Sequence, residues 1–230
     1  MIVSLIGHGG YVGQNIKNAL KNNSDVEIIN LIDRDTKHKD MIDCVSKSDV
    51  FIHCAAIQRP LVNNVENFLP NFELTKKIVD NLTESTKLIF ISSIHYNSDT
   101  PFGIIRKKEE EYIQNNVKWY TIYHVPYTFG PFGKPDYNNV FNTYIINIIK
   151  NKNIIINEYV NEFPIISLNN FTRNVVSNLN KCLFIVDEFN TKNLTLLDFL
   201  HNLGKIHKRT DTDSDFLIEL RNVYDWYRNQ

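Results

Sequence analysis

The sequence opens with Ile2-Val-Ser-Leu-Ile-Gly7-His-Gly9-Gly10-Tyr-Val-Gly13. An apolar run leads into a cluster of glycines, and an amphipathic stretch follows at Tyr11–Lys21. The glycines at positions 7, 10 and 13 meet three needs: a sharp turn from strand to helix, a close approach of the backbone to a bound group, and close packing of the helix on the sheet. Three glycines at these offsets directly after a strand predict a phosphate-binding turn at the start of a parallel α/β fold.

Short apolar runs and amphipathic segments alternate through the first half of the chain. We expect strands at Ile2–Ile6, Val26–Ile32, Val50–Cys54, Leu88–Ser92 and Trp119–Val125. We expect helices between them at Tyr11–Lys21, Asp40–Ser46, Phe72–Leu82 and Arg106–Asn115. Strand, helix and strand at this spacing predict parallel strands joined by right-handed crossovers, which is a Rossmann-type doubly wound sheet.

The regular alternation of apolar runs and amphipathic segments ends after Pro126. A turn-rich segment, Gly130-Pro-Phe-Gly-Lys-Pro135, precedes expected helices at Asn139–Ile149 and Asp213–Arg228. Neither a linker nor a repeat separates the two halves. We therefore predict a single domain over residues 1–230, in which 1–126 bind a dinucleotide and 127–230 form mainly a small C-terminal substrate-binding lobe.

Composition excludes several classes of function. The chain has 230 residues, 43% of them hydrophobic, and a net charge of −1, so nothing attracts it to nucleic acid or to an anionic membrane. The first apolar run is too short for a signal peptide, and no run has transmembrane length. The three cysteines are scattered, which is typical of reduced thiols in the cytoplasm. The histidines and cysteines lack metal-ligand spacing, so we expect no metal.

The glycine turn and the second strand indicate which residues hold a dinucleotide. The turn places Gly7, Gly10, Tyr11, Val12 and Gly13 at the pyrophosphate. The second strand ends in Ile32-Asp33-Arg34-Asp35. An aspartate there accepts hydrogen bonds from a ribose 2′-hydroxyl and favours NAD, whereas an arginine pairs with the 2′-phosphate of NADP. An ordinary solvated loop without a binding role explains the same residues equally well. If the loop does bind a dinucleotide, Arg34 slightly favours NADP(H) over NAD(H).

Several further motifs resemble a known family. They are Val50-Phe-Ile-His-Cys-Ala-Ala-Ile-Gln-Arg-Pro60, Phe68-Leu-Pro-Asn71, Ser92-Ser93-Ile94, Thr100-Pro-Phe-Gly103 and Phe132-Gly-Lys-Pro-Asp-Tyr-Asn-Asn139. The chain is similar in these motifs to the extended short-chain dehydrogenases and reductases, also called the NAD-dependent epimerase/dehydratase family. The most specific similarity is to the reductase domain of bifunctional capsular-polysaccharide enzymes that make precursors of UDP-N-acetyl-L-fucosamine. It starts at residue 1 and weakens after Val176, and we expect the C-terminal cupin domain of those enzymes to be absent.

The resemblance implies further site residues and partners. Those implied to contact the cofactor are Ala55, Ala56 and Asn71. Those implied to contact the substrate are Gln58, Arg59, His95, Tyr96, Tyr137 and Asn138. The implied substrate is a nucleotide sugar, and the implied protein partners are a second copy of the chain or another enzyme of a sugar pathway.

The resemblance also implies a reaction, the reduction of the C4 ketone of a UDP-4-keto-6-deoxy-hexosamine by NADPH. Such enzymes use a tyrosine as proton donor, a lysine four residues later and a serine that orients the ketone. Ser93 falls on the serine position, but the tyrosine and lysine positions hold Phe102 and Arg106. Phenylalanine carries no transferable proton, so another group must supply it, and Tyr96, His95 and Tyr137 are the candidates. The alternative is a catalytically degenerate protein that binds NAD(P) or a UDP-sugar to regulate or scaffold another enzyme.

Two other features have structural explanations. The charged run Arg106-Lys-Lys-Glu-Glu-Glu111 fits a helix whose exposed face, Lys107–Glu111, alternates in charge. His53 lies in an expected buried strand, where a core histidine with a hydrogen-bond partner explains it without a functional role.

Overall fold

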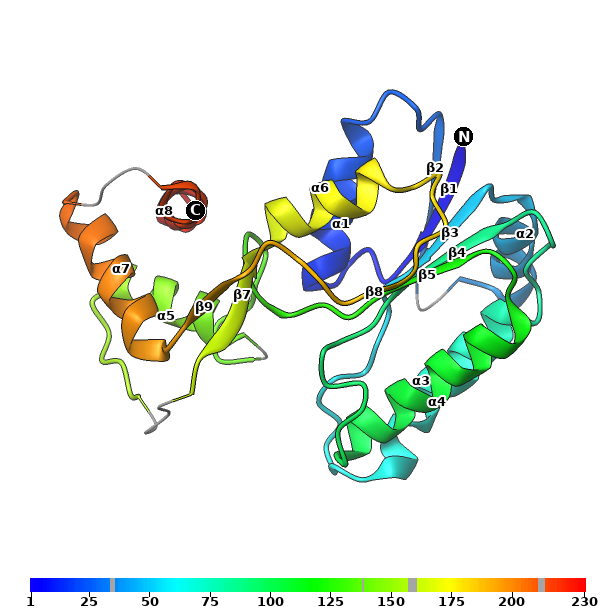
Figure 1. Ribbon diagram of the computed structural model, residues 1–230, viewed down its shortest axis with the longest axis horizontal. Coiled ribbons are helices and arrows are strands. Elements are labelled where there is room, and N and C mark those ends of the chain that lie inside the picture. The colour runs from blue at the N-terminus through cyan, green and yellow to red at the C-terminus, as the bar shows by residue number, and fades with distance from the viewer. Residues whose placement is uncertain (34–35, 138, 157–160, 211–213) are drawn as a thin grey trace. The chain divides into compact units, whose positions relative to one another are not determined.

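The computed structural model describes residues 1–33, 36–137, 139–156, 161–210 and 214–230. The chain forms two compact units (Figure 1). The first unit comprises Met1–Val125 and Asn174–Glu188, and the second comprises Pro126–Arg173 and Phe189–Gln230. The first boundary lies beside the expected division at residue 126, but residues 174–188 return to the first unit. The single-domain organisation stays a prediction.

The first unit contains a six-stranded sheet in the order β2-β1-β3-β4-β5-β8. Every strand pair in it is parallel. The strands are β1 (Ile2–Ile6), β2 (Ile28–Ile32), β3 (Val50–His53), β4 (Lys87–Ile91), β5 (Tyr120–Tyr123) and β8 (Phe184–Val186). The order reverses between β1 and β3, and at such a point parallel sheets leave a crevice at the carboxyl ends of the strands. The predicted Rossmann-type parallel sheet is confirmed.

Helices cover both faces of this sheet. They are α1 (Tyr11–Lys21), α2 (His38–Lys47), α3 (Val65–Val79) and α4 (Pro101–Asn116). One apolar cluster joins Met41 and Val45 of α2, Ile78 of α3 and Ile113 of α4 to inward-facing strand residues such as Phe90. Helices α3 and α4 lie side by side along this face, and α1 covers the other (Figure 1). The layered arrangement buries both faces, which is why these strands read as nearly continuous apolar runs.

Helices α2, α3 and α4 begin earlier than the sequence pattern predicts, and α3 and α4 do so by the widest margins. Helix α3 starts at Val65 because the Asn64 side chain accepts a hydrogen bond from the Asn67 backbone at 3.1 Å, and Pro70 is tolerated inside the helix. Helix α4 starts at Pro101 because Thr100 accepts from the Gly103 backbone at 3.1 Å. Both caps satisfy backbone N–H groups that the first turn leaves free.

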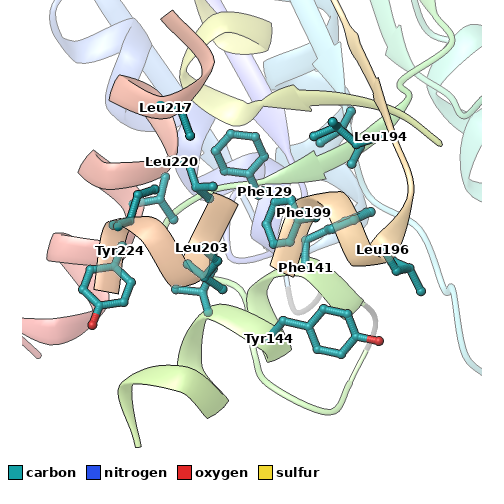
Figure 2. Packing of buried hydrophobic residues seen from close by; sticks show 14 residues of the cluster. Phe129, Phe141, Tyr144, Leu194, Leu196, Phe199, Leu203, Leu217, Leu220 and Tyr224 are labelled. Carbon is teal, nitrogen blue, oxygen red and sulfur yellow. The ribbon is translucent and has the colours of Figure 1, made fainter. Parts of the chain in front are cut away.

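The second unit has a separate sheet and core. Its strands, in the order β6-β7-β9, are β6 (Tyr127–Phe129), β7 (Phe163–Ser167) and β9 (Lys192–Leu194). Its helices are α5 (Val140–Ile149), α7 (Leu196–Lys208) and α8 (Asp215–Arg228), and α6 (Leu168–Ser177) runs from this unit into the first. Aromatic and aliphatic side chains from the sheet and from α5, α7 and α8 form the core (Figure 2). The expected helices at Asn139–Ile149 and Asp213–Arg228 match α5 and α8, although Asp213 lies outside the described residues.

Two global features bear on the composition argument. All three cysteines are free thiols. Among the described residues, no helix combines the length and the hydropathy that crossing a membrane requires.

Candidate functional site

The glycine turn has the geometry that its spacing predicts. Gly7 follows β1 with φ +88°, and a Cβ there would lie 2.5 Å from the Ala55 backbone nitrogen. A Cβ on Gly13 would lie 2.1 Å from the Gly7 carbonyl oxygen. Only glycine fits either position, because one needs a left-handed backbone and the other needs α1 in direct contact with the turn. A Cβ on Gly9, by contrast, would meet no atom within 4 Å, so the backbone there faces open space.

The end of β2 stands beside this turn. Asp33 follows the strand, and its side chain is 70% exposed. Its Oδ1 lies 2.7 Å from Nε2 of His8, a residue of the glycine turn whose side chain is only 15% exposed. Asp33 therefore lies beside the glycine turn, in contact with a histidine that the sequence did not suggest, and its role at a dinucleotide stays a prediction. Arg34 lies outside the described residues.

The exit of β3 forms the other side of the turn. Ala55 packs directly against Gly7, which brings the predicted small-residue segment Ala55-Ala56 next to the glycines. Asn71, buried in α3, accepts a hydrogen bond from the Ile57 N–H at 2.7 Å and donates to the Ile57 carbonyl at 3.0 Å. This pair of bonds braces the loop after Ala56. Gln58 and Arg59 beyond it are exposed.

Phe102 and Arg106 lie on one face of α4, in successive turns. The Arg106 guanidinium carbon lies 5.1 Å from the ring centres of both Phe102 and Phe90, and Nη1 lies 3.1 Å from Oε2 of Glu109. The side chains of Arg106 and Glu109 are 3% and 0% exposed. Arg106 is thus a buried cation, held between aromatic rings and a carboxylate of its own helix.

A chain of polar contacts continues from Glu109 into β3. Thr75 of α3 donates to Oε1 of Glu109 at 2.6 Å, and its hydroxyl lies 3.0 Å from Nε2 of His53. Burial raises the pKa of Glu109, and Arg106 and Thr75 oppose this shift. Burial, assisted by the charge of Arg106, lowers the pKa of His53 to about 3. His53 is therefore a neutral core histidine with a hydrogen-bond partner, as the sequence predicts.

A second buried cluster surrounds Glu110. Glu110 accepts a hydrogen bond from Ser92, and its Oε2 lies 2.9 Å from Nε2 of His124. The Nδ1 of His124 contacts Asp187. Burial by itself would lower the pKa of His124, but the hydrogen bonds and charges of Glu110 and Asp187 outweigh it and raise that pKa. The cluster joins the ends of β4, β5 and β8 to α4.

The predicted catalytic serine lies next to this cluster. Ser93 is half-buried, and its Oγ accepts a hydrogen bond from the His95 backbone at 3.2 Å. The Tyr96 backbone donates to the Ser93 carbonyl at 2.9 Å, so both residues belong to one turn. The Tyr96 ring stacks on His124 with 3.8 Å between ring centres. The structure therefore brings Ser93 and Tyr96 together, whereas His95 is exposed.

The remaining predicted substrate residues belong to the second unit. Tyr137 is 51% exposed, and Asn138 lies outside the described residues. The turn before them is fixed by Tyr227 of α8, which receives the Gly133 N–H at 2.8 Å and donates to the Gly130 carbonyl at 3.0 Å. Burial raises the pKa of Tyr227 to about 12, so its hydroxyl stays a donor.

No family model matches the chain. A curated relative does: the UDP-2-acetamido-2,6-beta-L-arabino-hexul-4-ose reductase of Pseudomonas aeruginosa is 26% identical over 182 residues, which are 75% of this chain and 48% of the relative. The chain thus spans about half the length of the curated relative that it matches. The solved structure of the capsular polysaccharide assembling protein CapF from Staphylococcus aureus matches with a TM-score of 0.79 and 23% identity, over 99% of this chain and 65% of CapF.

The chain resembles the extended short-chain reductases in sequence and in fold. The resemblance predicted from the motifs is confirmed. Epimerases share the fold: the UDP-N-acetylglucosamine 4-epimerase of Bacillus cereus matches with a TM-score of 0.83 and 14% identity, over 100% of this chain and 97% of the epimerase. A UDP-glucuronic acid 4-epimerase of Bacillus cereus, solved with UDP-glucuronic acid and NAD, has a TM-score of 0.81 and 15% identity, over 100% of this chain and 99% of that one.

The structure contradicts one interpretation of the sequence, the exposed charged face of α4. Lys107–Glu111 is not simply an exposed charged face, because Glu109 and Glu110 are 0% and 2% exposed. Each buried carboxylate has a partner from another element, which offsets the cost of burying its charge. The helical offset of three residues from Arg106 to Glu109 was the one signal that could have revealed the first pair.

Sequence reasoning also left out His8 and His124, which contact Asp33 and Glu110. A lone histidine beside a glycine carries no recognisable spacing, so His8 gave no signal before the fold was known. Among the described residues, no group of three histidine, cysteine or acidic side chains could hold a metal ion.

Proposed function

We propose that the chain is an NAD(P)-dependent oxidoreductase of a nucleotide sugar, similar to the 4-keto-6-deoxy-hexosamine reductases, with an altered tyrosine–lysine pair. The observation that carries the proposal is the glycine turn at the reversal of strand order, where Gly7 contacts the exit of β3. The name of the curated relative, a reductase of a UDP-4-keto sugar, supports the substrate class. The three free thiols are consistent with a cytoplasmic location.

The residues of the first unit suit a dinucleotide. The backbone at Gly9 faces open space, and α1 begins after Gly10 with neither a side-chain cap nor an acidic residue in its first turn. Free N–H groups at a helix N-terminus attract a pyrophosphate. Asp33 would accept the adenosine ribose hydroxyls, and the preference for NADP(H) rests on Arg34. The bound cofactor would supply the hydride.

Proton donation needs a group other than Phe102. Ser93 would orient the ketone oxygen, and Tyr96 of the same turn is our proposed acid. Its ring lies flat on His124, a histidine that the carboxylates of Glu110 and Asp187 favour in the cationic form. The stacking holds the Tyr96 ring against His124, and Tyr96 belongs to the same turn as Ser93. Arg106 would act on the site only indirectly, because Glu109 and two aromatic rings hold its guanidinium.

A specific observation also favours the alternative, a degenerate NAD(P)- or UDP-sugar-binding regulator. Phe102 has no hydroxyl, and Arg106 is 3% exposed and already paired. A chain that keeps the glycine turn and loses the acid would bind ligand without turning it over. The two functions therefore predict the same binding and different turnover.

The test measures binding and turnover separately. Isothermal titration gives the affinity for NADP(H), NAD(H) and a UDP-4-keto-6-deoxy-N-acetylhexosamine, and NADPH oxidation gives the rate with that sugar. The proposal expects turnover that falls about 10²–10⁴-fold in Tyr96→Phe, the usual worth of a general acid. Tyr112→Phe removes a hydroxyl that donates to Asp80 between α3 and α4, and should leave the rate unchanged.

The other outcomes separate the two functions. Binding without turnover, restored by Phe102→Tyr with Arg106→Lys, would support the degenerate alternative and confirm the positions of the lost pair. Phe102→Tyr alone should restore less, because Arg106 lacks the compact ammonium group of lysine. Binding of neither dinucleotide nor sugar would refute both functions.

A further inference from the structure

His8 is an unusual neighbour for the end of β2. It lies inside the glycine turn, between Gly7 and Gly9, and its side chain is 15% exposed. Its Nε2 reaches to 2.7 Å from Oδ1 of Asp33, whose own side chain is 70% exposed. The contact joins the two segments, the turn and the end of the second strand, between which the adenosine end of a dinucleotide is recognised in folds of this type.

The contact changes what Asp33 can do. A free carboxylate at this position accepts hydrogen bonds from a ribose 2′-hydroxyl and repels a 2′-phosphate, which carries roughly −1.5 to −2 charges near pH 7. Nε2 of His8, 2.7 Å from Oδ1, would offset the negative charge of the carboxylate whenever the imidazole is protonated. It also covers one oxygen of Asp33 and leaves the other for a hydroxyl.

We propose that His8 is a specificity-determining residue of the dinucleotide site. By pairing with Asp33 it weakens the repulsion of a 2′-phosphate, so the site accepts NADP(H) as well as NAD(H). The inference rests on the proposed function, because it concerns the same site. It assigns the tolerance for a 2′-phosphate to a residue of the glycine turn, in addition to the loop that follows β2.

The experiment compares dissociation constants by isothermal titration with NAD⁺ and NADP⁺. His8→Ala should weaken NADP⁺ binding about three- to fivefold, the upper end for a partly exposed charge contact, and should change NAD⁺ binding by less than about twofold. His8→Lys places a permanent positive charge beside Asp33 and should bind NADP⁺ at least as tightly as the wild type. His201→Ala removes an exposed imidazole from α7 in the second unit and should change neither constant. The φ of His8 is not positive, so these changes introduce no backbone strain.

A second variant tests whether His8 acts through Asp33. In an Asp33→Asn background the charge that His8 offsets is gone, so His8→Ala should no longer change the ratio of the two constants. An unchanged ratio in His8→Ala alone, or an equal loss for both dinucleotides, would overturn the inference. A full effect that persists beside Asp33→Asn would also overturn it, since His8 would then act on the phosphate directly. Wild-type protein that binds neither dinucleotide would refute the proposed function itself, a result distinct from binding with an unaltered ratio.

Discussion

Arg106 carries a positive charge into the interior of the first unit. It lies against Phe90 and Phe102 and pairs with Glu109, which in turn receives a hydrogen bond from Thr75. Such a pair adds little net stability compared with apolar residues of the same size. Removing one partner, however, leaves the other as a buried charge without a counter-charge. At the residue scale, therefore, Glu109 is required because Arg106 is present.

This pair predicts an asymmetric response to mutation. Glu109→Ala should cost about 3–5 kcal/mol of unfolding free energy, because Arg106 then remains buried without a counter-charge. Replacing both, as Arg106→Met with Glu109→Leu, should cost far less. Urea denaturation measures the difference, and Glu111→Ala, on the exposed side of the same helix, is the matched control. A loss below about 1 kcal/mol for Glu109→Ala would show that water or another group compensates the arginine.

The sequence predicted some residues of the first unit correctly and others incorrectly. The glycine offsets predicted the turn correctly, because Gly7 and Gly13 each meet a local steric demand that only glycine satisfies. Glu109 and Glu110 were misread, because a run of charged residues on a helix has the same pattern whether its partners are water or buried side chains. Their burial depends on Thr75 and His124, which the fold brings from other elements.

At the scale of elements, the positions of β1 to β5 and the start of α1 followed from the sequence pattern, while the starts of α3 and α4 did not. The observed strands β1 to β5 lie within the predicted runs or one residue outside them. Helices α3 and α4 begin at caps, Asn64 and Thr100, and apolar residues such as Phe68 and Phe102 follow within the first turns, so the caps were a signal that the sequence prediction left out. The short strand β8 was not predicted, although it lies in the apolar run Cys182–Val186.

The junction of β1 and α1 yields a prediction with an internal control. Gly13→Ala should destabilise the first unit by about 1–3 kcal/mol or more and abolish dinucleotide binding, because its Cβ would lie 2.1 Å from the Gly7 carbonyl oxygen. Gly9→Ala, four residues earlier, meets nothing within 4 Å and should leave the unfolding free energy unchanged. Thermal unfolding of both variants is the measurement. Equal stability of the two would mean that α1 does not press on the turn.

At the scale of the whole molecule, the unfolding free energy depends on pH through buried groups that stay neutral in the folded chain. His53 has a pKa of about 3 in the folded chain, whereas an unfolded histidine titrates near 6.5. Below pH 6.5 the unfolded chain therefore binds a proton at His53 that the folded chain does not bind. This proton binding stabilises the unfolded state and lowers the unfolding free energy. Above pH 6.5 both states leave His53 neutral, and its contribution no longer depends on pH.

The expected result is a loss of unfolding free energy as pH falls from 6.5 toward 3, with His53 contributing about 1.4 kcal/mol per pH unit. His53→Gln should flatten this part of the profile relative to wild type, and His95→Gln, an exposed substitution in the same unit, should not. Parallel profiles for wild type and His53→Gln would mean that His53 accepts a proton in the folded state.

The return of residues 174–188 to the first unit has a consequence for how the chain folds. Strand β8 pairs with β5 in the register Thr121↔Phe184, so the sheet closes across a loop that contains much of the second unit. Loop-closure entropy makes such distant pairings slow to form, and during synthesis the outer strand emerges long after the strand it must join. Until then β5, with Thr121, Ile122 and Tyr123 fully buried in the finished fold, is an unpaired apolar edge. We therefore expect nascent chains of this protein to aggregate most readily in the interval between the emergence of β5 and of β8.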